Sequence, residues 1–184
     1  MSLNLTAPES DQADQDDYLR RVRPAAWKNP VPKSVYDLVI LGAGPAGLAA
    51  AESAARHGRS VALVERYRLG GNSLNAGSVP SKALISTGRV FASIRDGEDF
   101  GAALSSKPPT DFAAVMARMR RIRTRIAEYH SVDRLGARGV DVFFCAGRFI
   151  SANTLLAGDT PLSFTKKCVS APSFRVPIEI SGLA

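Results

Sequence analysis

The chain has 184 residues and a mass of 19.6 kDa, and 45% of its residues are hydrophobic and 22% charged. These values are close to those of globular proteins and exclude a fibrous chain or one that is disordered throughout. No apolar run is long enough to span a bilayer, and the acidic start lacks the apolar core of a secretory signal, so a cytoplasmic protein with no membrane partner is expected. Two cysteines, Cys145 and Cys168, are too few for a disulfide framework or a metal site.

The net charge of +7 lies entirely beyond residue 34, because residues 1–34 hold as many acidic as basic side chains. One short stretch contains five arginines: Arg118, Arg120, Arg121, Arg123 and Arg125. Such a cluster could bind phosphates or another anionic ligand. The interpretation we favour is a solvated helix face. Since aliphatic rather than aromatic side chains lie between the arginines, nucleic acid is not the expected partner.

Residues 1–34 are expected to form an arm on the surface of a domain that occupies residues 35–184. One or two helical turns are predicted at residues 18–22, and the prolines that follow forbid a long helix. Trp27 lies between these prolines and predicts an anchor that holds the arm on the domain.

The domain is predicted to begin with a βαβ unit. Residues 35–41 form a buried strand, residues 42–47 a tight glycine-rich turn, and residues 48–57 a helix. A second buried strand follows at residues 60–64 and is ended by Glu65. This order of elements is typical of dinucleotide-binding folds.

The remainder is predicted to add two helices and several short strands. A loop at residues 69–81 precedes a helix at 83–95, and a longer helix runs from Asp111 to about residue 131. The apolar stripe of that longer helix consists of Phe112, Met116, Met119, Ile122, Ile126 and Tyr129. Strands are expected at residues 140–144, 148–151, 154–156, 162–164 and 167–169. The predicted fold class is therefore α/β, a Rossmann-like domain with a small antiparallel β insertion.

The pattern Gly42-x-Gly44-x-x-Gly47 has the context that a dinucleotide site requires, since a buried strand precedes it and a helix follows. The first glycine makes the turn, the second lets the backbone approach a pyrophosphate, and the third lets helix and strand pack closely. The helix N-terminus directs free amides at the phosphates. Glu65 is placed to accept hydrogen bonds from an adenosine ribose.

Residues 69–85 read LGGNSLNAGSVPSKALI and resemble the Gly-Gly-Thr-Cys-Leu-Asn-x-Gly-Cys-x-Pro-Ser-Lys signature of the class I pyridine nucleotide-disulfide oxidoreductases. That family includes dihydrolipoamide dehydrogenase, glutathione reductase and mercuric reductase, and the arm resembles that of mercuric-reductase-like members. The resemblance implies FAD as cofactor. The residues that it implies for the FAD site are Gly42, Gly44, Pro45, Ala46, Gly47, Glu65, Arg66, Gly71, Asn72, Ser73, Lys82 and Gly147.

The chain departs from the family pattern in three ways. Ser73 and Ser78 replace both redox cysteines, and a serine hydroxyl forms no disulfide and gives no comparable thiolate. Residues 171–175 (APSFR) replace the family's Ala-Thr-Gly-x-x-Pro stretch, which implies a weakened FAD site. The family's NAD(P)H-binding and dimerisation domains have no counterpart, so a truncated, incomplete FAD-binding domain with no intact catalytic residue is predicted.

Three functions remain open from the sequence. The first is the FAD-binding domain of a mercuric-reductase-like flavoprotein, without disulfide chemistry in this chain, whose partner is a second copy or a larger flavoprotein. The second is a non-enzymatic binding module or partner-dependent pseudoenzyme. The third is a small NAD(P)-binding reductase. In none of the three is a metal ion expected.

Overall fold

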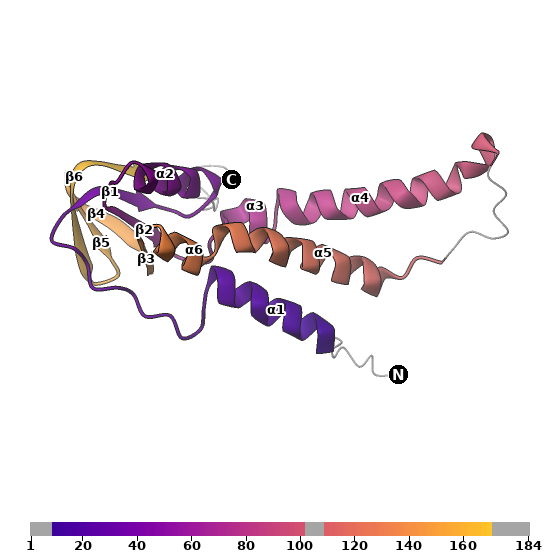
Figure 1. Cartoon of the computed structure of the whole chain (residues 1–184), viewed down its shortest axis with the longest axis horizontal. Coiled ribbons are helices and arrows are strands. Elements are labelled where there is room, and N and C mark those ends of the chain that lie inside the picture. The colour runs from indigo at the N-terminus through magenta and orange to yellow at the C-terminus, as the bar shows by residue number, and fades with distance from the viewer. Residues whose placement is uncertain (1–8, 102–108, 171–184) are drawn as a thin grey trace, which may run out of the picture.

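The computed structural model describes residues 9–101 and 109–170. Its elements in chain order are α1 (Glu9–Val22), β1 (Tyr36–Leu41), α2 (Pro45–Arg56), β2 (Val61–Glu65), α3 (Gly71–Asn75), α4 (Ser78–Arg95), the 3-10 helix η1 (Gly97–Phe100), α5 (Phe112–Ala127), the 3-10 helix η2 (Glu128–His130), α6 (Val132–Ala137), β3 (Val140–Phe144), β4 (Gly147–Ser151), β5 (Thr154–Ala157) and β6 (Thr160–Ser170). The sheet lies at one end of the molecule, and α4 and α5 extend away from it as a long hairpin (Figure 1). Within the described ranges, no helix is long and apolar enough to cross a membrane.

The six strands form one sheet in the order β3-β2-β1-β6-β5-β4. The pairs β3–β2, β2–β1 and β1–β6 are parallel, whereas β6–β5 and β5–β4 are antiparallel. The parallel pair β1–β2 is joined through α2, which is the predicted βαβ unit. The α/β, Rossmann-like fold class with a small antiparallel insertion is therefore confirmed.

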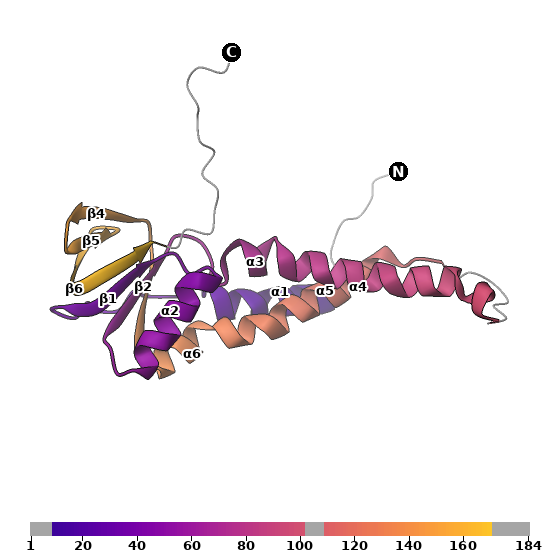
Figure 2. The ribbon, with the colours of Figure 1, turned by 90° about the horizontal axis from the view of Figure 1, so that it is seen from above.

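The sheet separates two apolar cores, because successive side chains of a strand point to opposite faces. In β2, Val61 and Leu63 pack with the helices, whereas Ala62 and Val64 face β5 and β6. The helices thus cover one face, and the antiparallel strands fold over the other (Figure 2). Because β1 and β2 are parallel, their carboxyl ends lie at the same end of the sheet, and the glycine-rich turn begins there.

The helix in the arm is longer than the one or two turns predicted for it. It spans 14 residues and packs beside α5 (Figure 1). Tyr18 and Val22 are fully buried in the helix-side core. Burial of this apolar face stabilises the helix, whereas its polar first residues carry no apolar periodicity that would predict a helix. The prediction that Trp27 anchors the arm is confirmed, since its ring packs edge-to-face on Phe144 with a centroid distance of 5.7 Å.

The prediction of a loop at residues 69–81 is wrong, because α3 and the start of α4 lie within this segment. Its glycine, serine and asparagine content is typical of loops, and that composition concealed two short helical segments. Pro80 does not interrupt α4, since it lies in the first turn, where a backbone N–H has no partner within the helix.

The predicted start of the long helix at Asp111 is confirmed, but its predicted end near residue 131 is wrong, because α5 ends at Ala127. Asp111 caps α5 by accepting a hydrogen bond from the Ala114 amide at 3.0 Å. The apolar stripe is only partly buried: Met119 is 7% exposed, whereas Phe112 and Tyr129 are 68% and 59% exposed. After α5 the chain passes through η2 into α6, which the sequence did not predict. The two strands expected at 162–164 and 167–169 are one continuous strand, β6.

The arginine cluster on α5 is not simply a solvated face. Arg118 donates from Nη1 to the Ala83 carbonyl at 3.1 Å and to Thr87 Oγ1 at 3.2 Å, which joins α5 to α4. The Arg123 guanidinium lies 4.1 Å from the centre of the Tyr18 ring, against α1. Arg121 and Arg125 are exposed, as the interpretation of the cluster as a solvated helix face requires. Arg118 and Arg123 therefore hold helices together.

The buried hydroxyl of Tyr36 predicts a loss of stability at high pH. Burial, with a hydrogen bond to Asp141 at 2.8 Å, raises the pKa of Tyr36 from 10.0 to about 12. Between these two values the folded chain keeps a proton that the unfolded chain releases, so this contribution to stability is complete below pH 10 and is lost as the pH rises through about 12. We expect the free energy of unfolding to fall in this window by at most about 1.4 kcal/mol per pH unit from this group.

Urea denaturation at a series of pH values from 8 upward measures this effect, with the variant Tyr36→Phe as control. The variant should be less stable near neutral pH by about 1 kcal/mol, because it loses the hydrogen bond to Asp141. At high pH the free energy of unfolding of the variant should also fall less steeply with pH than that of the wild type. Parallel curves for the two proteins would contradict the assignment.

Candidate functional site

The glycine-rich turn between β1 and α2 is shaped by the absence of side chains. Gly42 has a φ of 101°, in the left-handed region, and its amide donates to the Val64 carbonyl at 2.8 Å. A Cβ atom at Gly47 would lie 1.9 Å from the Gly42 carbonyl oxygen. The helix therefore packs directly on the turn, which is the role that the sequence assigned to its third glycine.

The N-terminus of α2 is open to an anion. Gly44 is its N-cap and supplies no side-chain hydrogen bond, and Pro45, the first helical residue, has no N–H. The amides of the first turn are therefore free of side-chain capping, and the positive end of the helix dipole lies beside them. Pro45 and Ala46 are exposed, whereas Gly44 and Gly47 are buried. An uncapped helix N-terminus of this kind favours an anion such as a phosphate group.

Glu65 lies beside the turn and is only 5% exposed. One carboxylate oxygen, Oε2, accepts a hydrogen bond from the Ala43 amide at 2.7 Å, and the other, Oε1, accepts one from the Tyr67 amide at 2.7 Å. The carboxylate thus joins the turn to the loop after β2. Each oxygen has a second lone pair, which could accept a hydrogen bond from a ribose hydroxyl.

The two glycine motifs of the sequence lie side by side. The Gly70 amide donates to the Ala43 carbonyl at 2.8 Å, which connects the turn to the start of α3. Gly70 and Gly71 both have positive φ, 86° and 56°. Asn72 is exposed, and its carbonyl accepts from the amides of Ala76 and Gly77. Both glycines are buried, and a Cβ atom at Gly70 would lie 2.4 Å from Leu74 Cδ2, so the missing side chain there makes room for α3 beside the turn.

The positions that the resemblance assigns to the redox cysteines are in direct contact. Ser73 on α3 and Ser78 at the start of α4 have their Oγ atoms 2.5 Å apart. Lys82 follows one turn later on α4 and is exposed. The fold keeps the two positions paired although neither carries sulfur.

Two other residues expected at the site lie at its border. Arg66 is exposed, and its guanidinium is 5.2 Å from the centre of the Tyr67 ring. Gly147 begins β4 and packs on the core, since a Cβ atom there would lie 2.5 Å from Leu41 Cδ1 and 3.2 Å from Val64 Cγ1. The segment 171–175, which was expected to weaken the site, lies outside the described residues.

Cys145 follows β3 directly and is half-buried. Burial raises the pKa of its thiol, which disfavours the reactive thiolate. The backbone of Cys168 is part of β6, and its side chain is not described. In the parts of the chain that the structure covers, no group of three or more His, Cys, Asp or Glu side chains could hold a metal ion.

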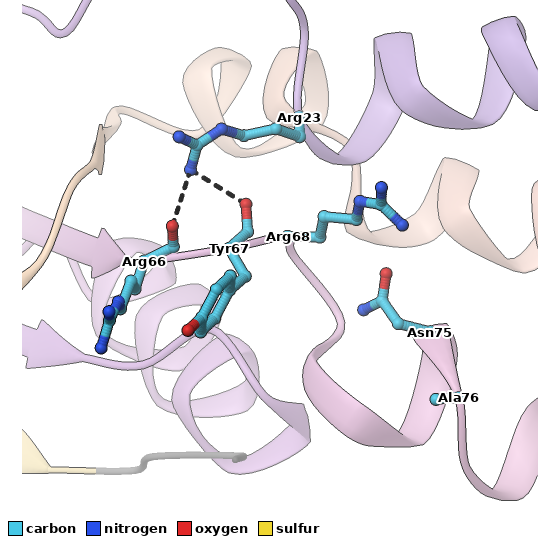
Figure 3. Close-up of a pocket in the computed structure, with 6 residues that line it drawn as sticks. All are labelled: Arg23, Arg66, Tyr67, Arg68, Asn75 and Ala76. Atoms are coloured by element: carbon cyan, nitrogen blue, oxygen red, sulfur yellow. Dashed lines mark hydrogen bonds between the residues drawn. The ribbon is translucent and has the colours of Figure 1, made fainter. Parts of the chain in front are cut away.

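The sequence did not identify the residues of the arm that reach the site. Arg23 Nη1 donates to the carbonyls of Arg66 at 3.1 Å and Tyr67 at 2.9 Å, and all three residues line a pocket of about 470 Å³ (Figure 3). The residues lining this pocket are Arg23, Arg66, Tyr67, Arg68, Asn75 and Ala76. Trp27 indicated that the arm touches the domain, but no local pattern shows which distant carbonyls an arginine will bind.

Comparison with known proteins agrees with this geometry. Residues 36–171 match the family described as pyridine nucleotide-disulphide oxidoreductase. The chain belongs to this family. It is 30% identical over 148 residues to a dihydrolipoyl dehydrogenase of Acholeplasma laidlawii, a match that covers 80% of the chain and 44% of that protein.

Other relatives match shorter stretches. A dihydrolipoyl dehydrogenase of Zymomonas mobilis is 42% identical over 92 residues, half of the chain and 20% of the relative. A soluble pyridine nucleotide transhydrogenase of Mycobacterium tuberculosis is 35% identical over 125 residues, 67% of the chain and 26% of the relative. The chain thus spans less than half the length of these curated relatives.

Proposed function

We propose that the chain is the FAD-binding unit of a flavin-dependent pyridine nucleotide-disulfide oxidoreductase of the mercuric-reductase-like kind. The observation that carries this proposal is the turn itself. Gly47 packs against the Gly42 carbonyl beneath an uncapped helix N-terminus, and the Glu65 carboxylate is held beside the same turn. This combination suits the pyrophosphate and ribose of a dinucleotide.

The residues of the chain have distinct parts in this binding. The first-turn amides of α2 hold the pyrophosphate, and the remaining lone pairs of Glu65 accept from the ribose hydroxyls. Gly71, by the family resemblance, lies along the cofactor. Lys82, by the family resemblance, lies near the flavin. When bound, FAD supplies reversible hydride uptake at its ring, and the protein supplies binding and orientation.

The serine pair limits the chemistry of this unit. Disulfide exchange requires a thiolate that attacks a sulfur, and the hydroxyls of Ser73 and Ser78 offer neither group. We therefore propose that this chain does not reduce disulfides or mercuric ion by the route of the family. One of the relatives is named a soluble pyridine nucleotide transhydrogenase, a name without a disulfide substrate, which is compatible with a unit that lacks the thiol pair.

The proposal is tested by titrating the purified chain with FAD and following flavin fluorescence. We expect saturable binding, and we expect Glu65→Gln to weaken it about tenfold or more, because an amide replaces a charged acceptor of two backbone hydrogen bonds. Glu98→Gln is the matched control, since Glu98 is exposed in η1 at the far end of α4, and its FAD affinity should equal that of the wild type.

A parallel titration with NADH distinguishes the other candidate functions. Binding of NADH and not FAD would replace the flavoprotein assignment with the small reductase. Binding of neither nucleotide would leave a binding module or a partner-dependent pseudoenzyme as the function of this chain.

A further inference from the structure

We propose that the N-terminal arm positions the adenosine side of the dinucleotide site, and that Arg23 is the residue through which it acts. The inference rests on the proposed function, since it concerns the same site. Glu65 is held by the loop of residues 66–70, which joins β2 to α3. The side chains of Arg66, Tyr67 and Arg68 are exposed, so burial of those side chains contributes little to the course of the loop.

Arg23 binds the peptide group that holds Glu65. The carbonyl of Arg66 and the amide of Tyr67 belong to one peptide group. Arg23 Nη1 donates to this carbonyl at 3.1 Å, and the amide donates to Glu65 Oε1 at 2.7 Å. A guanidinium on the carbonyl polarises the peptide and strengthens the donation from its N–H. Arg23 therefore acts on the carboxylate through one rigid, planar unit.

The guanidinium of Arg23 is itself held in place by the end of β3. It lies 4.6 Å from the centre of the Phe144 ring, and Trp27 packs edge-to-face on the same ring. The Phe144 amide donates to Asn29 Oδ1 at 2.8 Å. Three residues of the arm, Arg23, Trp27 and Asn29, therefore contact Phe144, which fixes the direction from which Arg23 approaches the loop.

A second set of contacts holds the other end of the loop. The Leu69 amide donates to the Val22 carbonyl at 3.0 Å. The Tyr18 hydroxyl donates to Asn75 Oδ1, and Asn75 Nδ2 donates to the carbonyls of Leu69 at 3.1 Å and Gly71 at 2.5 Å. The arm therefore binds the loop at both ends, and the pocket of Figure 3 lies between these two attachments.

The test compares Arg23→Ala, Arg23→Lys and Arg20→Ala. Arg20 is the matched control, because its side chain is 68% exposed and pairs with Asp17 of the same helix. Two measurements are made on each full-length variant: the FAD dissociation constant, and the hydrogen exchange rate of the backbone amides of residues 66–71 without any nucleotide. Thermal unfolding is followed in parallel to show that each variant is folded.

We expect Arg23→Ala to weaken FAD binding about tenfold and to speed exchange at the Tyr67 amide by a similar factor. Arg23→Lys should restore both to within about threefold, because an ammonium can donate to the same carbonyls. Arg20→Ala should match the wild type in both measurements. A merely structural role would change the unfolding temperature without this selective exchange and without rescue by lysine.

The two measurements separate this inference from the proposed function. If the wild type binds no FAD, the proposed function fails, and the exchange rates still decide whether Arg23 orders the Glu65 loop. If Arg23→Ala and Arg20→Ala show the same exchange at residues 66–71, the positioning role is overturned, whatever the FAD affinity.

Discussion

Gly47→Ala should lower the free energy of unfolding by about 3 kcal/mol, near the upper end of the usual cost of overpacking. The added Cβ atom would lie 1.9 Å from the Gly42 carbonyl oxygen and 3.3 Å from Ile40 Cγ2. The obstructing atom belongs to the backbone and cannot rotate away, so α2 must move off the turn. Because this contact holds the N-terminus of α2 on the turn, FAD binding should be lost as well. Urea denaturation and FAD titration measure the two effects.

Gly88→Ala is the control for this substitution. Gly88 also lies in a helix, α4, but a Cβ atom there would meet nothing within 4 Å. Replacing an exposed helical glycine by alanine should raise the free energy of unfolding by up to about 1 kcal/mol. The two variants should therefore move in opposite directions. Equal stability of Gly47→Ala and the wild type would show that the turn is looser than the structure has it.

The double variant Ser73→Cys/Ser78→Cys should form an intrachain disulfide on mild oxidation. The Oγ atoms of the two serines are already 2.5 Å apart, so sulfur atoms at these positions come within bonding reach after small adjustments. Thiol titration of the denatured protein should find about four thiols per reduced chain and about two after oxidation, since Cys145 and Cys168 remain free. Each chain either forms the disulfide or does not, so the thiol count distinguishes the two outcomes directly.

The control for the disulfide is Ser73→Cys/Ser86→Cys. Residue 86 lies two turns beyond Ser78 on α4, roughly 12 Å along the helix axis at 1.5 Å per residue. A disulfide between positions 73 and 86 cannot form over such a distance without movement of the backbone. The control should therefore keep about four thiols under the same oxidation. Similar oxidation of both variants would mean that α3 and α4 do not hold the two positions as the structure shows.

The central βαβ unit could be predicted because its signals are local. The buried strand before Gly42, the glycine spacing and the acid that ends the second strand all lie within about 30 residues of one another. Helices α1, α3 and α6 were missed or shortened for the opposite reason. Their residues have weak local preferences, and burial of side chains such as Tyr18 and Leu135 against distant elements stabilises them.

By itself the sequence determined the fold class, the family, the glycine turn and the replacement of both redox cysteines, because each of these is a pattern of neighbouring residues. The tertiary structure alone decided that Arg23 binds the peptide group holding Glu65 and that Ser73 and Ser78 are in contact. It also decided which arginines of α5 hold helices together. The contacts of Arg23, Arg118 and Arg123 join segments far apart in the chain, and they exist only after the hydrophobic cores have brought those segments together. The contact between Ser73 and Ser78 joins two neighbouring helices, and it depends on how the chain turns from α3 into α4.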